Sequence, residues 1–317
     1  MTAERKWFLG VDGGQSSTVA AIGDETGAVK GVGKAGPCNH VSAGESRERF
    51  LHAVGGAVRA AEEAAGLSMV RYEAACLGFS GGPHDKEAPA REAVKAARYL
   101  ITSDAHIALT GATAGEPGII AIAGTGSIAY GRNAAGKTAR AGGWGYAMGD
   151  EGSAFDLVRQ ALRAILRFDE GWGPATSLRD ASLSATGARD ASDLLHRFYT
   201  PEYPRSRVAS YAPLVDEAAR HGDAVAREIL LGAAQALATY VAAVRRQLFH
   251  RGEPSQVSYI GGVFASDLLR ERFHLIAGLE GDSRVHAPLY GPAAGALLEA
   301  YRLAGLHVLP TGAPTGA

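Results

Sequence analysis

The chain has 317 residues, enough for two domains of ordinary size with substantial cores. Apolar residues make up 46% of it and charged residues 21%, with a formal net charge of −1, so a strongly basic surface for nucleic acid is not expected. Two cysteines, Cys38 and Cys76, are too few for a disulfide framework, which suits a reducing compartment.

The N-terminal segment becomes acidic and glycine-rich at Asp12 and lacks the apolar stretch of a signal peptide. Later apolar segments are interrupted by charge or glycine before the roughly 20 residues that a membrane span needs. We therefore expect a cytoplasmic protein without membrane contact. Glycine is the compositional outlier, because its 42 residues are nearly twice the usual ~7%.

The first hundred residues predict an antiparallel meander that continues into β-α-β-α units, which is typical of a mixed sheet flanked by helices. Glycine-rich and Asp-Glu-Thr-Gly turns separate the first three strands. The expected strands cover residues 7–12, 18–22, 28–33, 74–79 and 99–103, and the expected helices cover 45–65 and 85–98.

The pattern then starts again, with strand, glycine–hydroxyl turn, strand, turn and strand over residues 118–140. We interpret this as structural duplication without detectable sequence repetition. The remainder is mainly helical, with expected helices at 153–168, 175–185, 191–198, 211–221, 224–250 and 291–303 and a strand at 256–260. The predicted domains are 1–117, 118–305 with a helical insertion, and a loose tail over 306–317, with a hinge near 115–118.

Two motif matches are interpreted as misleading. Residues 131–138 fit the P-loop pattern GxxxxGK[ST], but that motif needs a helix beginning at its Lys-Thr, and a poor helix sequence follows Thr138. Residues 78–82 fit the GxSxG nucleophile elbow, yet Pro83 and His84 stand where its helix should begin. We expect a hairpin turn at the first and a glycine turn at the second.

Two glycine–hydroxyl turns, at residues 12–18 and 124–127, lie at equivalent places of the duplicated pattern. Glycine lets a backbone approach phosphate closely, while N–H groups and hydroxyls donate hydrogen bonds to it. We expect the paired turns to hold a triphosphate, with Asp12 holding hydrated Mg²⁺. The expected contacts are Gly13, Gly14, Gln15, Ser16, Ser17 and Thr18 in the first turn, and Gly124, Thr125 and Gly126 in the second.

A further segment, residues 142–153, carries five glycines in its first eleven residues and ends in Asp-Glu-Gly-Ser before an apolar periodic run. One of its polar residues is expected to cap the next helix. Capping alone does not account for the tryptophan and the glycines, and a carboxylate in such a wall can accept hydrogen bonds from sugar hydroxyls. Asp104 is a separate candidate for a general base, because it ends a strand, starts a helix and lies between the two turns in sequence.

These motifs occur in an order that resembles the N-acetylglucosamine kinase family, which belongs to a broader ATPase group with the BadF-type proteins. The resemblance spans roughly residues 8–300 and is most specific at residues 142–153. The segments that carry it are Gly10-Val11-Asp12-Gly13-Gly14, Ser103-Asp104-Ala105, Gly124-Thr125-Gly126-Ser127, Gly142 to Ser153, and Gly261-Gly262-Val263.

The resemblance implies an α/β fold of two actin-like (ribonuclease H-like) lobes, with ATP and a sugar in the cleft between them. It implies direct phosphoryl transfer with Asp104 as general base, and a nucleotide near Gly261, Gly262 and Ser266. Whether the chain forms a homodimer stays open. The expected sugar contacts are Asn39, Asp104, Ser127, Gly143, Trp144, Gly145 and Asp150.

Three alternatives remain. Some family members carry Asn directly after the second turn, whereas this chain has Ile128, so glucosamine or another hexosamine competes with N-acetylglucosamine. A regulatory or activating ATPase without sugar transfer is a rival from another class. The other branch of the group, the activators of CoA-dehydratases and reductases, carries a cysteine-bridged cluster, but Cys38 adjoins Asn39 and Cys76 lies in a buried strand, which argues against such a cluster.

Overall fold

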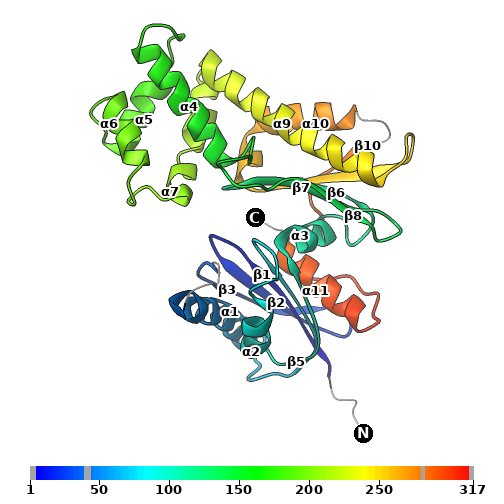
Figure 1. The fold of residues 1–317 in the computed structure, drawn as a ribbon. Helices are drawn as coiled ribbons and strands as arrows, with labels where there is room; N and C mark the ends of the chain where they lie inside the picture. Colours follow the sequence, from blue (N-terminus) through cyan, green and yellow to red (C-terminus); the bar gives the residue numbers. More distant parts are fainter. Residues whose placement is uncertain (1–4, 39–43, 280–282, 314–317) are drawn as a thin grey trace. The chain divides into compact units, whose positions relative to one another are not determined.

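The computed structural model describes residues 5–38, 44–279 and 283–313. The chain forms two compact units, Met1–Gly118 with Ala287–Ala317, and Ile119–His286. Each unit is built on a five-stranded sheet with helices packed against it (Figure 1). Among the described helices, none is long and apolar enough to cross a membrane.

The sheet of the first unit has the order β3-β2-β1-β4-β5. β1 pairs antiparallel with β2 and parallel with β4, and β4 pairs parallel with β5, so the meander runs into a parallel half as the sequence predicts. The strands are β1 (Trp7–Gly13), β2 (Thr18–Asp24), β3 (Val29–Ala35), β4 (Tyr72–Phe79) and β5 (Ala96–Ser103).

Helices cover both faces of this sheet, α1 (Gly44–Ala64) and α2 (Glu87–Ala93) on one and α3 (Asp104–Ala112) and α11 (Pro292–Leu303) on the other (Figure 1). Successive β1 side chains alternate between the faces. Leu9 packs in the core beneath α1, while Phe8 packs with Tyr301 of α11. The carboxyl ends of β1, β4 and β5 therefore come to one edge of a sheet that is fixed from both sides.

The second unit repeats the same strand arrangement. Read from its other edge, the sheet order is β8-β7-β6-β9-β10, which matches the first unit strand for strand. This confirms the predicted duplication. The strands are β6 (Gly118–Ala123), β7 (Ser127–Arg132), β8 (Thr138–Gly142), β9 (Ser255–Ile260) and β10 (Ser283–Val285).

One continuous core joins this sheet to the helices of the second unit. α9 packs on β7 and β8, and α10 packs on α9. The chain between β8 and α9 forms the predicted helical insertion. The helices are α4 (Ala154–Asp169), α5 (Leu178–Thr186), α6 (Ala191–Phe198), α7 (Arg205–Ala209), α8 (Pro213–Arg220), α9 (Ala224–Leu248) and α10 (Asp267–Gly278), with a 3₁₀ turn η1 (Gly262–Ala265).

The structure differs from the sequence prediction at several elements. The helix expected over 85–98 ends at Ala93, because residues 96–98 instead begin β5 and pair with the start of β4. The described part of the expected loose tail, residues 306–313, packs on the first unit: Leu306 and Val308 contact its core, and Thr311 bridges Ala28. α7, α10 and β10 were not predicted.

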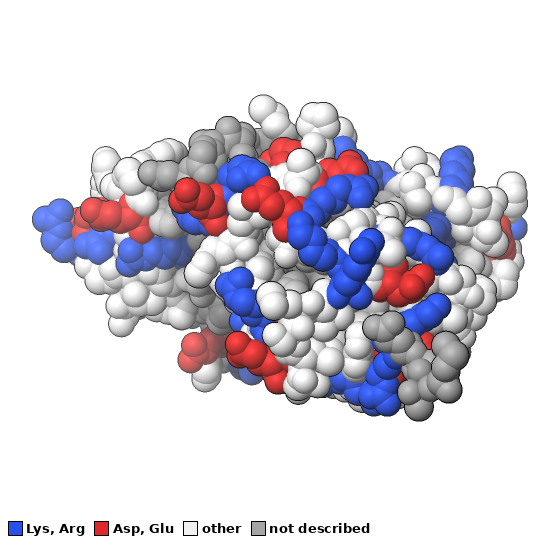
Figure 2. All heavy atoms as spheres, turned by 90° about the horizontal axis from the view of Figure 1, so that it is seen from below, with Lys and Arg blue, Asp and Glu red and all other residues white. Residues whose placement is uncertain are grey.

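Acidic and basic side chains are interspersed over the face displayed in Figure 2. Several surface arginines of the first unit form ion pairs with neighbouring carboxylates, among them Arg47 with Glu92, Arg91 with Glu87 and Arg98 with Glu73. Such exposed pairs contribute little to stability.

Candidate active site

Two carboxylates meet at the carboxyl edge of the first unit's sheet. Asp12 lies near the end of β1, and Asp104 follows β5 as the first residue of α3. Burial, and secondarily the charge of Asp104, raise the pKa of Asp12 to about 7. A cation beside Asp12 would stabilise the buried negative charge of its carboxylate. A buried carboxylate of this kind is suited to binding a metal ion.

Asp104 is held in place by two hydrogen bonds. Its Oδ1 accepts the backbone N–H of Ala105 at 2.8 Å, and its Oδ2 accepts the Ser80 hydroxyl at 2.7 Å. The helix cap is Ser103, whose side chain accepts from the N–H of His106. Asp104 is therefore not the cap, and its carboxylate retains lone pairs for a further donor.

Ser80 is a site residue that the sequence reading did not assign. It follows β4, and its backbone N–H donates to the carbonyl of Gly13 at 3.1 Å. The buried Lys86 secures the same turn, because its Nζ donates to the carbonyl of Gly82 at 3.1 Å and pairs with Asp85 at 2.9 Å. Ser80 thus ties Asp104 to the first glycine–hydroxyl turn.

The first turn closes through a hydrogen bond from Gly14 N–H to Ser17 O at 2.9 Å. Gln15 and Ser16 are exposed at its tip, where a phosphate could reach them. Thr18 is different, because it is fully buried and its hydroxyl donates to Gly36 O at 2.9 Å. The Thr18 hydroxyl therefore makes a hydrogen bond within the protein, and its expected contact with a phosphate gains no support from the structure. Asn39 lies outside the described residues.

The second turn lies at the corresponding place in the second unit, between β6 and β7. Gly124 N–H donates to Gly126 O at 2.9 Å, and Gly124 O accepts from Ala154 N–H at 2.8 Å. Ser127 is buried and its hydroxyl donates to Glu151 O at 2.7 Å. Its hydroxyl therefore fastens the turn to the glycine-rich segment, and a sugar contact through that group gains no support.

The glycine-rich segment leads from β8 to α4. Ser153 caps α4 by accepting from Asp156 N–H, which confirms that one residue of the segment is a cap. Gly143 lies against Ile128, since a Cβ there would be 2.8 Å from Ile128 Cδ1. Trp144 is 68% exposed with the Arg140 guanidinium 4.8 Å from its ring centre. Gly143, Trp144 and Gly145 thus belong to one open wall.

Asp150 lies at the inner end of this wall and is buried. It has a φ of 61°, a conformation that non-glycine residues rarely adopt. Its Oδ1 accepts Ser127 N–H at 3.3 Å, and its Oδ2 pairs with Arg205 of α7. Arg205 was not predicted from the sequence, because it lies 55 positions further along in a region without a recognisable motif.

The neighbouring Glu151 accepts a hydrogen bond from the Tyr240 hydroxyl of α9. Burial and this bonded carboxylate raise the pKa of Tyr240. The two acids of the Asp-Glu-Gly-Ser sequence thus have separate partners, Arg205 from the helical insertion and Tyr240 from the long helix.

A pocket of about 660 Å³ opens in the second unit beside η1. Gly262 and Ser266 line it, and Gly261 precedes it at the end of β9. Ser266 also caps α10 by accepting from Leu269 N–H. The remaining wall includes polar side chains at α8 that were not predicted from the sequence: Asp216, Glu217 and Arg220 of the helix and His221 directly after it. The pocket has the size of a small-molecule site and a mixed apolar and polar lining.

The two misleading motifs are resolved by local structure. Residues 131–138 form the turn between β7 and β8, and Lys137 Nζ donates to Gln247 O at 3.2 Å. No helix begins there, which confirms the hairpin prediction. Ser80 is followed by a turn rather than a helix start, and its hydroxyl bonds to a carboxylate rather than to a histidine base.

Both cysteines are buried, and burial raises the pKa of each thiol. Cys76 lies within β4, as predicted. Within the described residues no group of three or more His, Cys, Asp or Glu side chains could hold a metal ion. A single carboxylate such as that of Asp12 is compatible with a hydrated Mg²⁺ whose other ligands are water and substrate phosphates.

Comparison with known proteins shows which family the chain belongs to. The sequence pattern of the BadF/BadG/BcrA/BcrD ATPase family matches residues 9–300. The chain belongs to this family. It is 32% identical to the N-acetylmuramic acid/N-acetylglucosamine kinase of Clostridium acetobutylicum over 81% of this chain and 85% of the relative.

Two further curated relatives are sugar kinases. The N-acetyl-D-glucosamine kinase of Dictyostelium discoideum is 30% identical over 80% of this chain and 84% of the relative. The glucosamine kinase GspK of Vibrio cholerae is 28% identical over 78% and 81%. Together the three relatives place the chain among ATP-dependent sugar kinases, and their names refer to three different amino sugars.

The fold agrees with this assignment. A crystal structure from Chromobacterium violaceum, provisionally named an N-acetylglucosamine kinase, superposes with a TM-score of 0.77 at 29% identity, covering 92% of this chain and 98% of its own. Each unit of the present chain therefore has the actin-like ATPase fold, as the resemblance implied.

Proposed function

We propose that this family member transfers the γ-phosphoryl group of ATP to a hydroxyl of an amino sugar, with N-acetylglucosamine as the main substrate. The observation that carries the proposal is the Asp104 carboxylate, oriented by Ser80 beside the glycine–hydroxyl turn. Within hydrogen-bond reach of a sugar hydroxyl, such a carboxylate acts as a general base.

The reaction is a direct transfer. Asp104 accepts the proton of the sugar hydroxyl, whose oxygen forms a bond to the γ-phosphorus while the bond to the ADP oxygen breaks. Positioning and charge stabilisation supply most of the rate in such transfers. The two turns donate N–H groups to the phosphates, and the pocket beside η1 takes the base of the nucleotide. Mg²⁺ held at Asp12 would neutralise charge on the phosphates.

The choice among amino sugars rests on Ile128. Its side chain lies against Gly143 in the glycine-rich wall. An apolar group packs better against an acetamido methyl than against the ammonium group of glucosamine, because burying an unpaired charge is costly. This supports N-acetylglucosamine over glucosamine. N-acetylmuramic acid shares the acetamido group, and the Clostridium relative is named for both sugars.

A coupled assay of ADP release tests the proposal. The sugars are N-acetylglucosamine, glucosamine, N-acetylmuramic acid and glucose, at one pH and saturating ATP. We expect the highest kcat/KM for N-acetylglucosamine. A tenfold preference corresponds to about 1.4 kcal/mol of transition-state binding. Preference for glucosamine by that margin would overturn the N-acetyl assignment only. ATP turnover that no sugar stimulates would instead favour a regulatory ATPase.

A further inference from the structure

The Arg205–Asp150 pair joins the helical insertion to the two functional segments of the second unit. Nη2 of Arg205 pairs with Asp150 Oδ2 and also donates to Thr125 O at 3.2 Å. Thr125 belongs to the expected phosphate turn and Asp150 to the expected sugar wall. One guanidinium therefore contacts both segments.

The guanidinium is enclosed by more than its ion pair. Its carbon lies 5.4 Å from the ring centre of Tyr146 and 6.0 Å from that of Phe155. Arginine is suited to this position, because its planar group can stack on aromatic rings while donating in the plane. Its Nε is buried without a hydrogen-bond partner among the described residues.

Close packing leaves this pair no room to move towards the turn. A Cβ added at Gly126 would lie 2.7 Å from Arg205 Nη2 and 2.9 Å from Asp150 Oδ2. A side chain at this position would therefore displace the ion pair. Oδ1 of Asp150 is fixed separately by Ser127 N–H. The carboxylate is held at both oxygens and keeps lone pairs for sugar hydroxyls.

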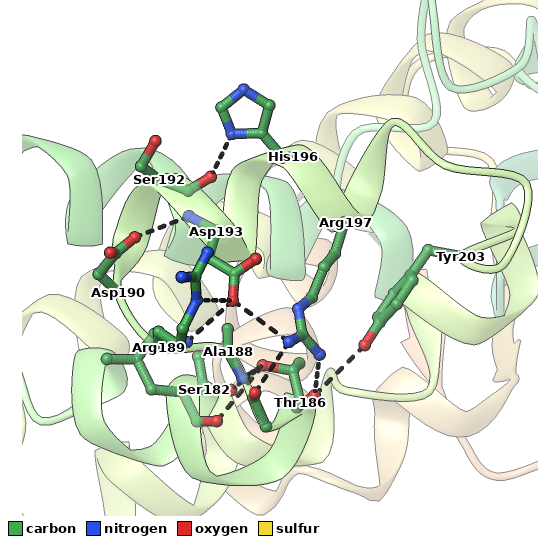
Figure 3. Close-up of polar contacts among 12 residues, drawn as sticks. Ser182, Thr186, Ala188, Arg189, Asp190, Ser192, Asp193, His196, Arg197 and Tyr203 are labelled. Carbon is green, nitrogen blue, oxygen red and sulfur yellow. Dashed lines mark hydrogen bonds and ion pairs between the residues drawn. The ribbon is translucent and has the colours of Figure 1, made fainter.

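A polar network fixes the chain just before Arg205 (Figure 3). Arg197 of α6 donates to Thr186 O at 2.7 Å and to Gly187 O at 2.9 Å. It also pairs with Asp193, whose pKa is lowered by the backbone N–H of Arg189 and by Arg197. The Tyr203 hydroxyl donates to the same Thr186 O at 3.4 Å, and the buried Tyr203 ring packs against Phe198 and Tyr211.

We infer that Arg205 is a positioning residue for amino-sugar recognition, which holds the Asp150 carboxylate in place and compensates its charge. The inference rests on the proposed function. A buried carboxylate that loses its partner is strongly unfavourable, so Asp150 would leave this position once Arg205 was removed. Sugar binding should then weaken more than turnover, because Arg205 pairs with Asp150 of the expected sugar wall, whereas Asp104, the expected base, is held by Ser80.

The test compares Arg205→Ala with Arg207→Ala in the full-length enzyme. Arg207 is on the same short helix but is exposed, with its guanidinium over the Tyr203 ring. We expect Arg205→Ala to raise the sugar KM on the order of ten- to hundredfold, with kcat and the ATP KM each changing less than about threefold. Arg207→Ala should match the wild type.

Two further measurements separate positioning from a merely structural role. Added methylguanidinium should lower the sugar KM of Arg205→Ala and leave that of Arg207→Ala unchanged. In a double-mutant cycle, Arg205→Ala combined with Asp150→Ala should bind sugar no more weakly than Asp150→Ala alone. An unchanged sugar KM in Arg205→Ala, or additive effects in the cycle, would overturn the inference.

The outcomes remain distinguishable from failure of the proposed function. If the wild type phosphorylates no amino sugar, the proposed function fails. If it does so and Arg205→Ala is equally effective, only the inference fails. Should Arg205→Ala not fold, Arg205→Lys decides, because lysine keeps the charge but lacks the planar group that lies over the Tyr146 and Phe155 rings while Nη2 contacts both Asp150 and Thr125. A raised sugar KM in that variant supports the inference, and a wild-type KM overturns it.

Discussion

At the level of single residues, the proposed chemistry depends on Asp104 and on the Ser80 hydroxyl that donates to it. Asp104 is the first residue of α3, but Ser103 is the residue that caps this helix. The Asp104 carboxylate accepts one backbone N–H, that of Ala105, and keeps lone pairs for other donors. Ser80 reaches it from the neighbouring strand end. A carboxylate with one oriented face and free lone pairs is placed to accept a proton.

Asp104→Asn should therefore remove most sugar kinase activity. An amide cannot accept the proton, and loss of a general base costs on the order of 10²–10⁴ in rate. Steady-state kinetics measure the loss, and calorimetry with a slowly hydrolysed ATP analogue should show nearly unchanged nucleotide affinity. Glu87→Gln is the control, since Glu87 is an exposed acid at the start of another helix, α2. Wild-type kcat in Asp104→Asn would exclude Asp104 as the base.

At the scale of elements, the long helix α9 depends on its N-terminal cap. Asp223 accepts from Ala226 N–H at 2.9 Å, and its other oxygen accepts from Thr176 and Ser177 of the preceding loop. Burial acts to raise the pKa of Asp223, but these hydrogen bonds together lower it. One carboxylate thus fixes both the helix start and the loop before α5.

Asp223→Ala should destabilise the second unit by about 1–2 kcal/mol at neutral pH, the usual effect of losing a helix cap. Because the folded pKa is lowered, the wild-type contribution is fully present above the ordinary value of 3.8 and is lost as pH falls below it. Urea unfolding at pH 7 and near pH 3.5 should show a smaller difference at the acid pH. Exposed Glu228→Ala on the same helix is the control. A difference independent of pH would contradict this account.

At the scale of the whole molecule, the chain returns to its first unit at the end. α11 packs on β1 and against α3, so residues near position 300 complete the core begun near position 8. Gly295 of α11 allows the closest approach, because a Cβ there would collide with Ile107 O and lie 2.5 Å from Gly111 N. The helix that begins with Asp104 is therefore positioned by the end of the chain.

Gly295→Ala should cost about 1–3 kcal/mol of stability, the usual effect of overpacking, and should lower kcat by displacing α3. Gly232→Ala is the matched control, since Gly232 lies in α9 with no atom within 4 Å of an added Cβ. That change should instead stabilise by roughly 0.5–1 kcal/mol, because alanine is the better helix former. Chemical denaturation measures both. Equal effects of the two substitutions would refute the close contact between α11 and α3.

The repeated strand pattern, the glycine–hydroxyl turns and the position of Asp104 between a strand and a helix could all be predicted from the amino-acid sequence. These are local features, because alternation, turn chemistry and helix starts depend on residues close together in the chain. The P-loop match could also be excluded from the sequence, because that motif requires a helix that begins at its Lys-Thr pair.

Which side chains contact one another could not be predicted and became clear from the folded chain. Ser80 reaches Asp104 across 24 positions, Arg205 reaches Asp150 across 55, and α8 supplies part of the pocket beside Gly262. It also showed that the Thr18 and Ser127 hydroxyls, expected to face ligands, bond inside the protein. The residues next to a hydroxyl or guanidinium in the sequence do not indicate its hydrogen-bond partner, because that partner depends on how the strands and helices pack.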